Sequence, residues 1–114
     1  MDELAAEVAA ATGFDKSIAR AASVIMVRFL LAEAKSPKTA EVVDAIPGAR
    51  GAVAASGAAT PGMMGVLTDL RVAGVGLMSI QSVAKAFMRA VSARAGQANV
   101  EEVARSVPGL AQFM

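Results

Sequence analysis

The sequence predicts a soluble all-α protein, a compact bundle of about five to seven helices with a pseudo-two-fold internal repeat. Three observations lead to this prediction. Hydrophobic residues, many of them alanine, make up 55% of the 114 residues, and alanine has the highest helix propensity. Apolar residues recur at helical spacing in two long segments. Capping and stop residues divide the chain at short intervals. We expect residues 1–114 to form one domain.

The first two helices are expected at the beginning of the chain. Asp2 can cap a helix that ends near Thr12, since acidic residues are favoured in a first turn. A long helix over residues 16–34 is apolar on most of its circumference. A helix of this kind is buried on several sides. We therefore expect it to be the central helix of the bundle.

The next elements are short. Ser36-Pro37 is typical of a helix start, because proline is favoured in the first helical position. This third helix should run to about residue 45, and a short helix should follow over residues 49–54. Residues 55–62 contain several turn formers and are the only segment that resembles a linker.

The second half is expected to contain three helices. Helical spacing favours helices over residues 63–72 and 80–95. Asn99 is a suitable cap for a last helix. We expect Leu110 and Phe113, which follow that helix, to pack back against the core.

The two halves of the chain correspond in sequence. We define repeat unit one as residues 13–54 and repeat unit two as residues 74–114. Each unit has a long apolar helix, a short helix and then an aliphatic-Pro-Gly turn, which is Ile46-Pro47-Gly48 in the first unit and Val107-Pro108-Gly109 in the second. Proline cannot continue a helix, and glycine permits a tight reversal. The repeat predicts an approximate two-fold axis that relates the long helices.

This order of signals resembles a group of small bacterial helical domains of unknown function, the VcgC/VcgE-like group. Its members have a long apolar helix, a Ser-Pro restart, an Ile-Pro-Gly segment and a Gly/Ala-rich middle. The resemblance implies a helical fold and a bacterial origin, and it implies no activity. It is carried by Gly13-Phe14, Ser36-Pro37, Ala45-Ile46-Pro47-Gly48 and residues 56–76.

The residue types that are missing exclude several classes of function. The sequence has no cysteine and no histidine, so a disulfide, the usual zinc sites and a Ser-His-Asp triad cannot form. We therefore expect no enzyme and no cofactor. The net charge of +1 makes nucleic acid an unexpected partner. The acidic N-terminus lacks the positive charge of a secretion signal, and no segment favours a membrane span, so we expect a cytoplasmic protein.

Two polar patterns in the second half have a chemical and a structural interpretation. Ser82 and Lys85 have the Ser-x-x-Lys spacing of penicillin-recognising enzymes, but the other motifs of that family are missing, so chance is the preferred explanation. Lys85 and Arg89 lie four residues apart on one helix face. They are candidates for a weak anion patch, although a solvated face is the usual outcome.

The methionines supply the main functional hypotheses. Met63, Met64, Met78, Phe87 and Met88 are the candidate apolar groove or interface, because methionine adapts to irregular gaps and to binding surfaces. The leading hypothesis is a non-enzymatic module for protein–protein interaction or self-association into a homo-oligomer, since the composition exceeds what one small domain can bury. The alternative is a binder or sensor of a small apolar ligand or acyl chain between the long helices.

Overall fold

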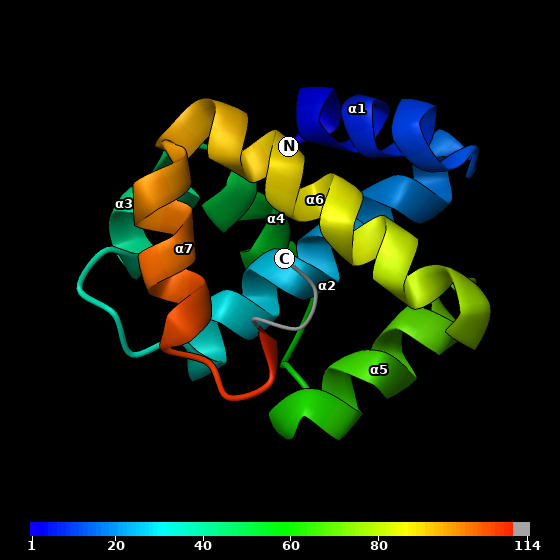
Figure 1. The fold of residues 1–114 in the computed structure, drawn as a ribbon. Coiled ribbons are helices and arrows are strands. Elements are labelled where there is room, and N and C mark those ends of the chain that lie inside the picture. The colour runs from blue at the N-terminus through cyan, green and yellow to red at the C-terminus, as the bar shows by residue number, and fades with distance from the viewer. Residues whose placement is uncertain (111–114) are drawn as a thin grey trace.

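The computed structural model describes residues 1–110, which form seven α-helices and one 3₁₀-helix (Figure 1). The predicted all-α bundle is therefore confirmed. The elements are α1 (Asp2–Thr12), α2 (Lys16–Glu33), α3 (Thr39–Asp44), α4 (Ala49–Ala55), α5 (Gly62–Val72), η1 (Leu77–Ser79), α6 (Ile80–Ala95) and α7 (Gln97–Arg105).

Helix α2 is the centre of the bundle, as its apolar circumference predicts. It packs against α1, α3, α4, α5 and α6. Ala22 and Val27 are completely buried, and the hydroxyl of the buried Ser23 donates to the carbonyl oxygen of Ala19 at 2.8 Å. Because that hydroxyl is satisfied within its own helix, α2 can be buried on several sides without an unpaired polar group.

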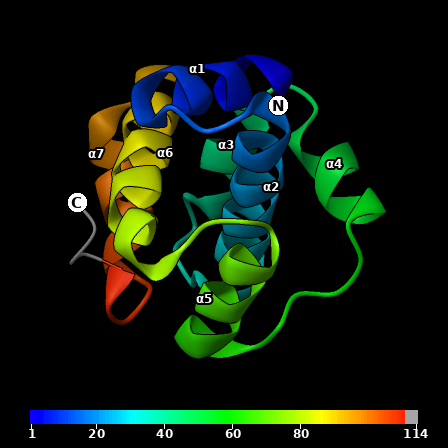
Figure 2. The ribbon, with the colours of Figure 1, turned by 90° about the vertical axis from the view of Figure 1, so that its right-hand side faces the viewer.

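The other helices are arranged around α2 and α6 (Figure 2). Helix α1 crosses one end of both helices and buries Leu4, Ala5 and Val8 against them. Helix α4 lies at the periphery, with only Ala49 buried. Helix α5 packs along α2, from Glu33 beside Gly62 to Ile18 beside Gly74, and lies on the opposite side of the bundle from α1 in Figure 2. This arrangement leaves α5 with a buried inner face and an outer face that no other described element covers.

Three predicted helix starts differ from the structure. Asp2 does not cap α1 but is its first residue, with Met1 in the capping position and no side-chain cap. Helix α7 begins at Gln97, because Gly96 has a positive φ of 90° and turns the chain earlier than Asn99. Asn99 instead donates its side-chain N–H to the carbonyl oxygen of Ala95 at 2.9 Å. Helix α3 begins at Thr39, since the Ser36 hydroxyl accepts the N–H of Lys38 at 3.0 Å and holds a turn ahead of the helix.

The two aliphatic-Pro-Gly turns share local structure. Ile46 and Val107 are both buried, and Gly48 and Gly109 have similar positive φ angles of 78° and 85°. The amino group of Met1 donates to the carbonyl oxygen of Pro47. These similarities are local, so the predicted two-fold axis stays a prediction. Leu110 is buried, as expected, whereas Phe113 lies outside the described residues.

We predict that Gly48→Ala destabilises the protein by about 1–2 kcal/mol, which is the steric strain of a β-carbon in the left-handed region. The new methyl group would have room, because its nearest neighbour is the Met1 nitrogen at 3.8 Å. The lower free energy of unfolding would therefore come from backbone strain alone. The matched control is Gly51→Ala within α4, where φ is helical and the space is open. That change should stabilise by about 0.5–1 kcal/mol. Equal effects of both substitutions in urea denaturation would contradict this interpretation.

Candidate functional site

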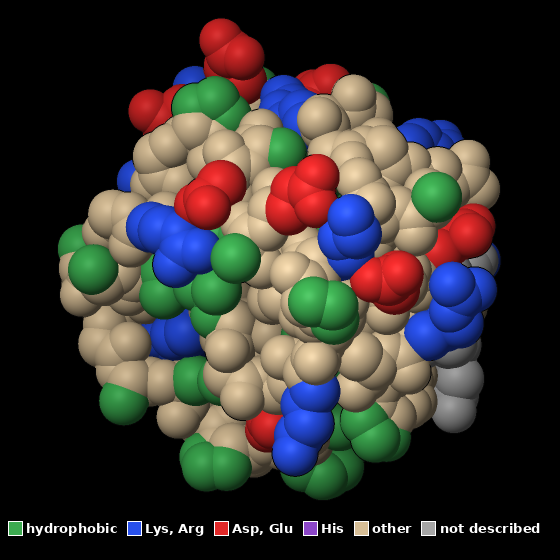
Figure 3. All heavy atoms as spheres, turned by 90° about the vertical axis from the view of Figure 1, so that its left-hand side faces the viewer, with side chains coloured by type: hydrophobic (Ala, Val, Ile, Leu, Met, Phe, Trp, Pro, Cys, Tyr) green, Lys and Arg blue, Asp and Glu red, His purple; other side chains and the backbone are tan. Residues whose placement is uncertain are grey.

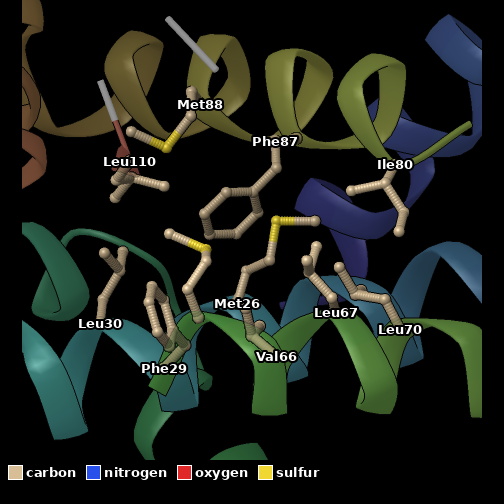
Figure 4. Close-up of a pocket in the computed structure, with 12 residues that line it drawn as sticks. Met26, Phe29, Leu30, Val66, Leu67, Leu70, Ile80, Phe87, Met88 and Leu110 are labelled. Carbon is tan, nitrogen blue, oxygen red and sulfur yellow. The ribbon is translucent and has the colours of Figure 1, made fainter. Parts of the chain in front are cut away.

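A small apolar cavity of about 30 Å³ lies between α2, α5 and α6. Every residue that lines it is apolar, so the cavity offers no hydrogen bond to a water molecule and should be dry. Figure 4 shows Phe87 and Met88 of α6 facing Met26 and Phe29 of α2 across this space. The lining residues are Met26, Phe29, Leu30, Met63, Val66, Leu67, Leu70, Ile80, Ala84, Phe87, Met88 and Leu110.

The structure divides the five candidate groove residues between two places. Met63, Phe87 and Met88 line the cavity. Met64 and Met78 instead lie on the surface, where their exposed fractions are 75% and 96%. The five residues thus do not form one groove, because Met63 and Met64 are adjacent on a helix and point to different sides of it.

Sequence reasoning placed the alternative apolar site between the two long helices but named none of the residues that α2 contributes to the cavity. These residues are Met26, Phe29 and Leu30. A helix that is apolar on most of its circumference gives no indication of which side faces a gap. One signal was available, since Met26 and Met88 occupy corresponding positions in the two repeat units, and both line the cavity.

Helix α5 covers the cavity and is held by a few specific contacts. Val66 and Leu70 of α5 are buried and line the cavity. Arg28 Nη2 lies 3.1 Å from Asp69 Oδ2, with side chains only 13% and 22% exposed. At the other end of α5, the backbone N–H of Gly62 donates to Glu33 Oε1 at 2.7 Å. These polar contacts connect both ends of α5 to α2.

Loops flank α5 at both ends, so the helix is not continuous with the neighbouring helices. Gly62 and Gly74 have positive φ angles of 79° and 109°, a conformation that glycine adopts without steric cost. Residues 56–61 contain no helix or strand. Helix α5 therefore joins the rest of the bundle through two loops and one packed face.

A second feature of α5 is the group of large hydrophobic residues on and just after its exposed side, which also carries Thr68 and Arg71. The large hydrophobic residues that are exposed within the described part of the chain all fall between positions 64 and 78. They are Met64 at 75%, Val72 at 84%, Leu77 at 63% and Met78 at 96% exposure. In Figure 3, which views the side where α3 and α7 lie, acidic, basic and hydrophobic side chains are interspersed. The large hydrophobic residues that are exposed lie on α5 and η1.

The charged residues form surface ion pairs away from the cavity. A hydrogen bond and the positive charge of Arg20 lower the pKa of Asp2, and the corresponding contacts with Asp44 raise the pKa of Arg50. Both pairs are exposed. Residues 1–110 contain no group of acidic side chains that could hold a metal ion. None of these pairs indicates a catalytic centre.

The predicted anion patch lies on α6. Lys85 and Arg89 are both exposed on its outer side, and neither forms an ion pair with another residue of the described range. Their role in binding an anion stays a prediction.

No single helix within residues 1–110 is long and apolar enough to cross a membrane, although α5 and residues 77–95 together are long and apolar enough as a pair bent by 109°.

Comparisons of the chain with protein-family models, curated proteins and solved structures found no match. The resemblance to the VcgC/VcgE-like group therefore stays a prediction.

We predict that Asp69→Asn destabilises the protein by about 1–2 kcal/mol, since it leaves the partly buried Arg28 without its counter-charge. The matched control is Asp44→Asn, which breaks the exposed pair with Arg50 and should cost less than about 0.5 kcal/mol. Hydrogen exchange of the α5 amides should accelerate in Asp69→Asn only. Equal losses in both variants, or unchanged α5 exchange, would show that this ion pair does not hold α5 in place.

Proposed function

We propose that the chain is a non-enzymatic interaction module that associates with a second copy of itself through the outer face of α5 and the neighbouring η1. The observation that carries this proposal is the gathering of exposed large hydrophobic residues between positions 64 and 78. Single exposed hydrophobic residues are ordinary on a protein surface, whereas a group of them is typical of an interface.

The spacing on α5 supports this surface as a contact. Met64, Thr68 and Val72 are four residues apart, so they form one stripe along the outer side of the helix. The Thr68 hydroxyl donates to the carbonyl oxygen of Met64 at 2.9 Å. Because this hydroxyl already has a partner, covering Thr68 would leave no unpaired hydroxyl in the contact.

The stripe also fits the symmetry of a dimer. In an antiparallel pairing of two α5 helices about a two-fold axis, Thr68 lies at the centre, and Met64 of each copy meets Val72 of the other. Such a contact is self-complementary, as a two-fold interface must be. Leu77 and Met78 on η1 would extend the contact beyond the end of the helix. Small side chains at the centre allow the two helices to approach closely.

We predict that the wild-type protein is a dimer by light scattering and that Val72→Glu converts it to a monomer, because the new charge would be buried at the interface. The matched control is Ala98→Glu, which adds the same charge at an exposed position of α7 and should leave the dimer intact. A wild-type protein that remains a monomer at high concentration would refute self-association. A dimer that survives Val72→Glu would refute α5 as its interface.

A further inference from the structure

We propose that the cavity beneath α5 is the binding site for the hydrocarbon chain of a fatty acid, with the carboxylate beside Lys35. This inference concerns the inner face of α5 and an adjacent pocket. It does not depend on self-association through the outer face.

The lining of the cavity favours a hydrocarbon. All of its residues are apolar, so a ligand group with hydrogen-bonding atoms would lose its water without gaining a partner. Met26, Met63 and Met88 contribute unbranched thioether side chains, which can rotate to follow the shape of a ligand. An aliphatic chain is therefore the ligand class that this lining can accept.

The shape of the lining favours a linear chain over a ring. In Figure 4, Ile80 and Leu70 lie at one end of the space, and Leu30 and Leu110 lie at the other. The side chains of Met26 and Phe87 lie between these two ends. A chain that extends from one end to the other would replace contacts that these side chains now make with each other.

The site has to expand when the ligand enters. Its volume of about 30 Å³ is well below the roughly 150 Å³ that accepts benzene in a protein interior. Methionine rotation supplies part of the difference. Outward movement of α5 can supply the rest, since α5 joins the bundle through loops at both ends and one packed face. The narrow cavity is thus the ligand-free form of the site.

An open pocket of about 450 Å³ adjoins the cavity, and Phe29 and Met63 line both. This pocket has polar side chains where the cavity has none. Lys35, Ser106 and Glu33 are among its lining residues. A molecule that crosses from the cavity past Met63 would therefore carry its polar end into this pocket.

The charges in the pocket favour a carboxylate head group. Lys35 is exposed and forms no ion pair within residues 1–110, so its ammonium group is available. The Glu33 carboxylate would repel an anion, but it accepts the N–H of Gly62. The Ser106 hydroxyl donates to the carbonyl oxygen of Val103 at 2.6 Å. Lys35 is therefore the group that would bind the head.

The chain site can be tested on the wild-type protein by nuclear magnetic resonance of ¹³C-labelled methionine methyl groups during titration with monomeric lauric acid. We expect the methyl signals of Met26, Met63 and Met88 to shift in a saturable way. Met64 and Met78 are exposed and serve as internal controls. Shifts confined to Met64 and Met78 would indicate surface adsorption and overturn the proposal, as would the absence of any shift.

The head-group assignment is tested separately by Lys35→Gln. We expect lauric acid to bind this variant about three- to tenfold more weakly, while dodecanol, which has the same chain and no charge, binds wild type and variant equally. Lys38→Gln, which removes a lysine already paired with Glu41, is the matched control and should bind lauric acid as wild type does. An equal loss for both ligands, or no loss for lauric acid, would overturn the role of Lys35.

Discussion

The burial of α2 on several sides is the constraint on which the rest of the structure depends. Its N-terminal half presents Ala19, Ala22 and Ser23, which are small and buried, so neighbouring helices can approach closely. Its C-terminal half presents Met26 and Phe29, which hold the neighbours further away. The tightly packed part of the bundle and the cavity thus correspond to two halves of one helix. A chain without tryptophan or tyrosine has few large side chains with which to close such a gap.

The helices could be predicted from the sequence because their signals are local. Apolar periodicity and stop residues define α2 and α6 closely, and only some helix starts were wrong. The start of α7 depends on the backbone angle of Gly96, which composition does not reveal. The cavity could be predicted only in part. Phe87 and Met88 were identified, but the side of α2 that faces them is decided by tertiary packing.

Both proposals involve α5. Its inner face covers the proposed chain site, and its outer face carries the proposed dimer contact. If both hold, outward movement of α5 on ligand entry would also displace the stripe formed by Met64, Thr68 and Val72. Binding at either face would then alter affinity at the other, and thermodynamic linkage requires the two effects to be equal. The ion pair between Arg28 and Asp69 would be the contact through which this coupling is adjusted.

The cavity also has a consequence for the volume of the molecule. An empty space that water does not enter is lost when the chain unfolds, so the unfolded state occupies less volume than the folded state. Rising hydrostatic pressure should therefore disrupt the packing of α5 against α2 at a lower pressure than it disrupts the tight contacts around Ala22. The part of the core that contains this space should therefore be compressed more easily than the tightly packed part around Ala22.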